Sequence, residues 1–240
     1  MALPKQSAPI YNATVPSSKQ EVKYRPFLVK EEKTLLIAQQ SNDPQVMLDT
    51  LKGIIKNCVQ NDLDVEKLAL FDIEYLFCQI RAKSVGEVVE MMVMCDKCPE
   101  DETKARIKLT FDLTKLEVNF PAGHENKIQL FDDVGVIMKY PTLATLKELE
   151  NIDQNSSETL FKVIIKMIDC IYDSEQVYMA KDQTEKELVD FLENLTQDQF
   201  KKLQNFFVTM PKLSKSVEYD CPVCSHHHEK IVEGLAGFFQ

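Results

Sequence analysis

The sequence predicts an α+β fold, with a mainly helical body, short antiparallel β-hairpins and one site that joins two distant Cys-x-x-Cys knuckles. Three observations support this class. Apolar residues recur at three- to four-residue spacing over 31–84 and again beyond residue 141, as in amphipathic helices. Runs that alternate between apolar and polar residues lie between these stretches, as in half-buried strands. The two knuckles are 122 residues apart, and each lies between two β-like runs.

We expect a single domain over residues 1–240, because a chain of this length can bury a sizeable core. Its predicted parts are an N-terminal hairpin over 9–30, helices over 31–84, hairpins over 85–113 and 214–234, and a mostly helical insertion over 114–213.

Turn and cap signals place the elements of the first third. Pro16-Ser17-Ser18-Lys19 is a turn-forming segment between two β-prone runs. Asp43 before Pro44 is typical of a capped helix start, and Asp64 offers a further cap. The predicted elements are strands within 9–15 and 21–29, and helices that begin at Glu31, after Asp43 and at Asp64.

Alternation and capping boxes place the remaining elements. Residues 105–113 alternate cleanly between apolar and polar side chains. Thr184 with Glu187 and Thr196 with Gln199 have the spacing of capping boxes. The predicted elements are strands within 85–94, 105–113, 127–131, 134–140, 171–179, 214–219 and 230–232, and helices after Thr142, after Ser156 or Ser157, near 185–194 and near 197–207.

The composition argues against several classes of protein. No apolar run approaches the ~18–20 residues of a membrane span, so none is expected. Only six glycines are present and neither glycine-rich phosphate-binding motif occurs, which argues against nucleotide enzymes built on such loops. The net charge of −10 opposes nucleic-acid binding, which needs clustered Lys and Arg. The first residues lack the apolar segment of a secretory signal, so we expect a cytoplasmic protein.

Four of the seven cysteines form the pairs Cys95-x-x-Cys98 and Cys221-x-x-Cys224. In a reducing compartment such cysteines are metal ligands or free thiols more often than disulfides. Two-residue spacing lets both sulfurs of a pair point at one ion, and two pairs complete a tetrahedral site. We therefore expect a structural zinc ion held by all four cysteines, in a zinc-ribbon-like site that joins two of the hairpins. Four protein ligands leave no position for a catalytic water.

Two alternatives stay open for these cysteines. One is thioredoxin-type redox chemistry, but that motif opens a helix, whereas these pairs lie in polar turns between β-like runs. The other is a mixed site in which His226, His227 or His228 replaces a cysteine. The same histidines could instead donate to a sulfur from outside the ligand shell, and at least one of the three is expected to face solvent.

The other candidate residues have structural interpretations. Cys58, Cys78 and Cys170 lie in apolar segments and are expected to be core thiols. His124 is expected to be a loop residue. The methionines within 91–94 are expected to fill the core, although a methionine-rich strand can also form an adaptable binding surface.

Three stretches carry a resemblance to a known family. They are Arg25-Pro-Phe-Leu-Val-Lys-Glu-Glu-Lys33 with Leu35-Leu36 and Ala38 after the opening hairpin, the cysteine knuckles, and the ending Ile231-Val-Glu-Gly-Leu-Ala-Gly-Phe-Phe-Gln240. In these stretches the chain resembles the baseplate hub assembly protein family of T4-like contractile-tailed bacteriophages.

The resemblance implies a non-enzymatic protein, made late in infection, that acts as a baseplate component or an assembly factor. Its partners would be other phage baseplate or tail proteins, with no small-molecule substrate. Its places would be the host cytoplasm during assembly and the tail baseplate of the virion. The candidate partner contacts are Leu235, Phe238 and Phe239, which could dock as apolar and aromatic anchors. The alternative is a tail folded onto its own core.

Two functions of other classes compete with this one. A zinc-ribbon nucleic-acid-binding or transcription factor is the alternative that the net charge opposes. A metallohydrolase is opposed by the closed set of four cysteines.

Overall fold

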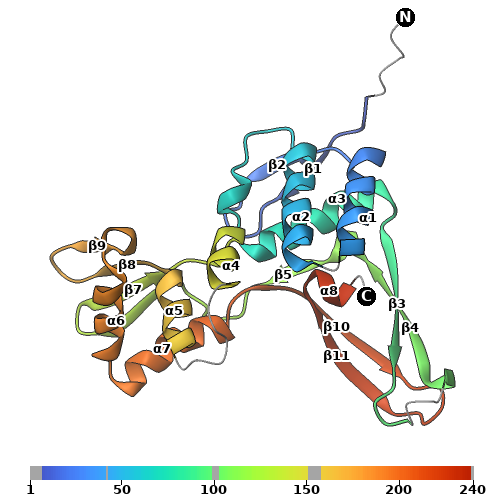
Figure 1. Cartoon of the computed structure of the whole chain (residues 1–240). Coiled ribbons are helices and arrows are strands. Elements are labelled where there is room, and N and C mark those ends of the chain that lie inside the picture. Colours follow the sequence, from blue (N-terminus) through green and yellow to red (C-terminus); the bar gives the residue numbers. More distant parts are fainter. Residues whose placement is uncertain (1–6, 42, 99–102, 151–157, 239–240) are drawn as a thin grey trace, which may run out of the picture. The chain divides into compact units, whose positions relative to one another are not determined.

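The computed structural model of the chain describes residues 7–41, 43–98, 103–150 and 158–238 (Figure 1). Along the chain it divides into two compact units. Unit 1 is Met1–Asn119 with Lys212–Gln240, and unit 2 is Phe120–Pro211, which is inserted into unit 1 in sequence. The single domain over 1–240 remains a prediction, and each unit is described by itself.

The helices of unit 1 begin at capped or proline-marked positions. Asp43 caps α2, because its side chain accepts a hydrogen bond from the Gln45 backbone N–H at 2.9 Å, and Pro44 opens the helix as predicted. Asp64 does not open the third long helix. It caps one turn of 3₁₀ helix, which ends where Leu68 is extended, and α3 begins six residues later than predicted. The bounds are α1 Val29–Ser41, α2 Pro44–Cys58, the 3₁₀ turn Val65–Lys67 and α3 Leu70–Ser84.

The predicted N-terminal hairpin is confirmed, with β1 at Tyr11–Thr14 pairing antiparallel to β2 at Glu21–Tyr24. Its turn is tied to α3 by a fully buried carboxylate. Asp72 accepts hydrogen bonds from the Ser17 backbone N–H at 2.9 Å and from the Ser17 hydroxyl at 2.5 Å. A buried carboxylate is stable only when it is hydrogen-bonded in this way.

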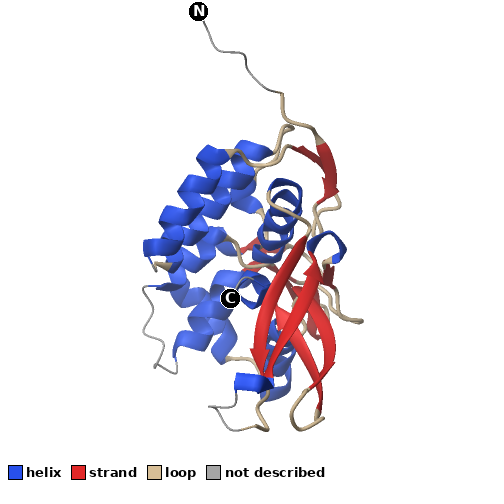
Figure 2. Cartoon of the chain, turned by 90° about the vertical axis from the view of Figure 1, so that its right-hand side faces the viewer, coloured by secondary structure: helices blue, strands red, loops and turns tan. Residues whose placement is uncertain are grey.

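Two antiparallel ribbons follow the helices in unit 1 (Figures 1 and 2). β3 (Val88–Met94) pairs with β4 (Arg106–Asp112), and β10 (Lys212–Asp220) pairs with β11 (His227–Glu233). Their inward-facing side chains share one apolar core with α3. The buried members of that core are Cys78, Ala82, Val89, Met91, Val93, Leu109, Phe111, Leu113, Leu116, Leu213, Tyr219 and Val232.

A short strand closes unit 1 where the chain leaves it and returns. β5 (Glu117–Asn119) pairs antiparallel with the first residues of β10, so that Asn119 lies opposite Lys212. The strand order of this sheet is therefore β11-β10-β5. The last residues before unit 2 and the first after it are neighbours in one sheet, which keeps the ends of the insertion together.

The described part of the C-terminal end folds onto unit 1. α8 (Gly234–Phe238) begins at a glycine with φ +64°, a conformation that other residues rarely adopt. The carboxylate of Glu74 in α3 accepts a hydrogen bond from the Leu235 backbone N–H at 3.2 Å. The Leu235 side chain is half-buried against the apolar core of unit 1.

In its described residues, unit 2 contains a four-stranded antiparallel sheet, four α-helices and one 3₁₀ turn at Ala180–Asp182. Both predicted capping boxes are confirmed, Thr184 with Glu187 at the start of α6 and Thr196 with Gln199 at the start of α7. The strand order is β6-β7-β8-β9. The bounds are β6 Lys127–Phe131, β7 Val134–Met138, α4 Leu143–Glu150, α5 Glu158–Met167, β8 Ile168–Tyr172, β9 Val177–Met179, α6 Glu185–Glu193 and α7 Gln197–Val208.

The structure therefore has the α+β class that the sequence predicts. A mainly helical body is not confirmed, because antiparallel sheets form a large part of both units. Within the described ranges, none of the helices has the length and hydropathy that a membrane span requires.

His124 has a more defined place than the loop position predicted for it. Its Nδ1 lies 2.9 Å from the Thr209 hydroxyl and its Nε2 lies 3.1 Å from the Tyr140 hydroxyl. The ring also packs against Phe206, with ring centroids 5.0 Å apart. Burial lowers the pKa of His124 below its ordinary value. The imidazole is thus a neutral, hydrogen-bonded part of unit 2.

This burial predicts a pH dependence of stability. A histidine whose pKa is lower when folded than when unfolded stabilises the fold above its unfolded pKa, near ~6.5, and loses that contribution as the pH falls. His124→Gln keeps an amide that can bond to both hydroxyls but cannot titrate. We expect the wild-type urea midpoint to fall toward that of the variant between pH 7.5 and 5.5. A difference between the two midpoints that stays constant over this range would contradict the assignment.

Candidate metal centre

The two Cys-x-x-Cys knuckles lie at the ends of the two ribbons of unit 1. The first follows β3 directly, and the second is the turn between β10 and β11. Each turn is closed by the backbone. The Cys95 N–H donates to the Ala105 carbonyl at 3.2 Å, and the Cys221 N–H donates to the His226 carbonyl at 2.9 Å. Because the ribbons pack face to face, the two turns meet.

The four sulfurs form one cluster. The Sγ atoms of Cys95, Cys98, Cys221 and Cys224 all lie within 4.8 Å of one another. Two pairs that link the knuckles, Cys95 with Cys224 and Cys98 with Cys221, are each 3.7 Å apart. Four sulfurs placed ~2.3 Å from a central ion in a tetrahedron are ~3.8 Å from one another. The spacing fits a shared ion and is far too long for a disulfide.

Backbone amides point at one sulfur of each knuckle. The Lys97 N–H donates to the Cys95 sulfur and the Val223 N–H donates to the Cys221 sulfur, both at 3.4 Å. These two sulfurs are the buried ones, 4% and 2% exposed respectively, while Cys98 is half-buried and Cys224 is exposed. Each knuckle thus supplies one deep thiol held by an amide and one shallow thiol.

The surroundings act in opposite directions on the pKa values of two of the thiols, Cys221 and Cys98. The backbone N–H of Cys224, joined by that of Val223, lowers the pKa of the Cys221 thiol to about 7. Loss of hydration and the neighbouring sulfurs raise the pKa of Cys98 to about 12. A divalent cation removes this conflict, because a coordinated thiol is deprotonated outright. The cluster therefore has the chemistry of a metal site.

His228 lies against the cluster, and with Cys95 and Asp96 it forms a second group whose possible ligand atoms lie within 4.8 Å of one another. Its Nε2 is 3.2 Å from the Cys95 sulfur, and its Nδ1 is 3.6 Å from a carboxylate oxygen of Asp96. The ring stacks on Tyr219 with centroids 4.9 Å apart. These contacts fit an outer-shell donor to the Cys95 sulfur, and they also leave the mixed cysteine and histidine site open.

Comparison with known proteins places the chain in a family. A family model described as T4 bacteriophage base plate protein matches residues 8–240. The chain belongs to this family. No curated protein and no solved structure gives a significant match. The resemblance inferred from the sequence is confirmed at the level of a T4-like phage baseplate protein.

Cys58, Cys78, Cys170 and His227 of the baseplate protein lie outside the cluster of four cysteines. Cys58, Cys78 and Cys170 are all buried, at 0%, 0% and 3% exposure, as expected of core thiols. His227 is exposed and pairs with Asp220, its Nδ1 being 2.8 Å from a carboxylate oxygen. This pairing raises the pKa of His227.

The candidate partner residues at the C-terminus remain a prediction. Leu235 packs against the core of unit 1, while the Phe238 side chain and the whole of Phe239 lie outside the described residues. The methionines of β3 divide between its two faces. Met91 is buried at 7% exposure, whereas Met92 and Met94 are 59% and 41% exposed, so the expected core role holds for Met91 alone.

The sequence contained an unused signal for His228. In β11 it has the same parity as Val232, which is buried, so strand alternation would have favoured it over its neighbour His227. Asp96 carried no such signal, because its role depends on the approach of a segment more than a hundred residues away.

Replacement of Cys224 by alanine is expected to abolish metal binding and to destabilise unit 1 by about 3 kcal/mol or more, since metal-binding energy becomes folding energy. Cys224 is exposed, so truncating it removes little packing. Elemental analysis of protein purified without chelator, with urea denaturation, provides the measurement.

Cys58→Ala is the matched control for that variant. It removes a buried thiol of α2 and should lower stability without changing metal content. Wild-type protein that purifies without metal, or a Cys224→Ala protein that keeps one ion per chain, would contradict the prediction.

Proposed function

We propose that this baseplate protein acts without catalysing a reaction, in the assembly of the phage baseplate and its hub. It works as a baseplate component or as an assembly factor, through contacts with other baseplate or tail proteins. It is located in the host cytoplasm during assembly and in the virion tail. The family match supports the baseplate role, and the cluster of four cysteines is the observation that supports a structural rather than a catalytic centre.

The proposed occupant of the cluster is one structural zinc ion, held by Cys95, Cys98, Cys221 and Cys224. Four sulfurs at tetrahedral spacing favour zinc or iron–sulfur chemistry over Mg²⁺ or Ca²⁺, which prefer oxygen ligands. A single ion with four protein ligands has no open position for substrate or water, which argues against a metallohydrolase. The ion would instead hold the ends of the two ribbons together.

An exposed face of β3 supports a role in protein contacts. Val88 and Met92 on this face are 57% and 59% exposed, although the opposite face of the same strand is already buried in the core. Met94 on the same face is 41% exposed, and Glu90 between Val88 and Met92 forms an ion pair with Lys108 of β4 at 2.7 Å. Exposed apolar side chains around an ion pair are a candidate contact for a partner protein.

The second ribbon does not support the nucleic-acid alternative. On its outward face Glu218 lies directly opposite Glu229, and Asp220 is the next residue of β10 on the same face. Four thiolates around one zinc ion would add further negative charge. This surface repels phosphate, which is bound by clustered Lys and Arg.

Mass spectrometry of purified virions beside unfinished tail intermediates tests the proposed function. We expect the chain in baseplate or hub intermediates, and its presence or absence in finished virions separates a component from an assembly factor. Absence from both kinds of particle would overturn the proposal. Salt-dependent binding to duplex or single-stranded DNA would favour the nucleic-acid alternative instead.

A further inference from the structure

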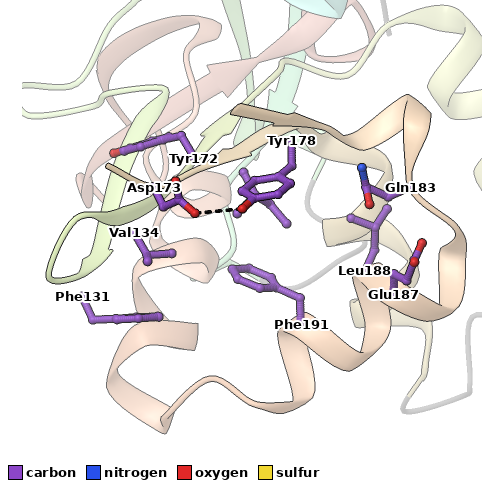
Figure 3. A pocket seen from close by; sticks show the side chains of 10 residues that line it. Phe131, Val134, Tyr172, Asp173, Tyr178, Gln183, Glu187, Leu188 and Phe191 are labelled. Carbon is purple, nitrogen blue, oxygen red and sulfur yellow. Dashed lines mark hydrogen bonds between the residues drawn. The ribbon is translucent and has the colours of Figure 1, made fainter. Parts of the chain in front are cut away.

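A pocket of about 330 Å³ lies within unit 2, between the sheet and α6 (Figure 3). Four aromatic residues from four different elements contribute to its lining. They are Phe131 at the end of β6, Tyr172 at the end of β8, Tyr178 in β9 and Phe191 in α6. Its volume is at the low end of the range for ligand sites, which suits one large side chain better than a cofactor.

The walls of the pocket are apolar and partly open to solvent. Phe131 is 40% exposed, while Leu188, also in the lining, is buried at 5% exposure. Aromatic side chains are large apolar groups that prefer tilted or offset contacts with other aromatic rings. An aromatic side chain entering from outside would meet such rings on several sides.

Two fixed carboxylates give the pocket a negative charge. Asp173 accepts hydrogen bonds from the Glu175 and Gln176 backbone N–H groups at 2.8 and 2.9 Å, and from the Tyr178 hydroxyl at 2.9 Å. Glu187 accepts from the Thr184 backbone N–H at 2.8 Å. These hydrogen bonds lower the pKa of both carboxyls, so both are ionised at neutral pH.

No basic side chain compensates these charges within the pocket. Of the described residues that line it, none is a lysine or an arginine. The cation at Lys127 lies over the Tyr172 ring, 4.8 Å from its centroid, but is not part of the lining. The pocket therefore offers an apolar interior and two carboxylates, with no basic side chain in its described lining.

We propose that this pocket receives an aromatic side chain from a lysine- or arginine-rich segment of a partner protein. Apolar burial of the ring supplies affinity, and attraction between the basic flanks and the two carboxylates supplies selectivity. The chain's own Phe-Phe end is a poor occupant, because residues 234–240 contain no basic residue. This inference goes beyond the baseplate role and does not depend on the metal.

The absence of tryptophan from the chain permits a direct test. The probe is the peptide acetyl-Lys-Lys-Trp-Lys-amide, with acetyl-Glu-Glu-Trp-Glu-amide as its charge control. Titration of each peptide with the full-length protein is followed by tryptophan emission, to which the protein contributes no tryptophan signal. We expect a shift to shorter wavelength for the basic peptide and a dissociation constant at least tenfold lower than for the acidic one.

Three variants assign the binding to the pocket. Phe131→Ser removes part of the wall of the pocket and should raise the dissociation constant of the basic peptide at least fivefold. Glu187→Gln keeps a capping side chain but removes one charge. It should reduce the ratio between the dissociation constants of the acidic and basic peptides. Val208→Ser replaces an exposed residue of α7, 77% exposed, and should change nothing. Circular dichroism confirms that each variant is folded.

The outcomes decide the proposal. Equal binding of the two peptides would overturn the basic partner chemistry. Equal weakening by Phe131→Ser and Val208→Ser would overturn the pocket as the binding site. No emission shift with the basic peptide would overturn both.

Discussion

The cluster of four cysteine sulfurs is the constraint on which the architecture of unit 1 depends. Each ribbon alone is a two-stranded hairpin with one apolar face, an arrangement that is marginal in water. Packing the ribbons face to face buries those faces, and the knuckles join the ribbons at the ends that follow β3 and β10. Other features stabilise the place where the ribbons meet. The alternation of β3 and β4 gives each strand one apolar face. Tyr219 stacks on His228, and backbone N–H groups donate hydrogen bonds to the sulfurs of Cys95 and Cys221.

The insertion of unit 2 between the knuckles is tolerated because two features bring its ends together, the pairing of β5 with β10 and, farther along the chain, the cysteine cluster. The cost of closing a loop grows only with the logarithm of its length, and an insertion with its own core adds little disorder. The pairing of Asn119 with Lys212 brings the two ends together in the sheet β11-β10-β5, before the chain reaches the second knuckle. Unit 2 has its own buried core around its sheet, which includes Val136, Ile164 and Leu203. A knuckle spacing that looks too long for one site is therefore consistent with one site.

Local signals in the sequence predicted local structure well. The capping boxes at Thr184 and Thr196, the proline at the start of α2 and the alternation of β4 depend on neighbouring residues alone. The two Cys-x-x-Cys pairs were recognisable as one cluster because ligand chemistry constrains their number and spacing. Features that depend on long-range approach were not accessible. The strand β5 has only three residues and a partner more than ninety residues away, and the pocket of unit 2 is assembled from side chains between residues 131 and 191 with no common motif. The helix expected at Asp64 was misplaced because a genuine cap there serves only one 3₁₀ turn.

Hydrogen exchange of the full-length protein before and after metal removal tests the central claim most directly. The metal content of both samples is verified by elemental analysis. If the cysteine centre holds the ribbons together, chelation should remove amide protection from β3, β4, β10 and β11, while β7, β8 and α7 of unit 2 keep theirs. Ribbons that stay equally protected after verified removal of the metal would contradict the account. So would a loss of protection that is uniform over both units.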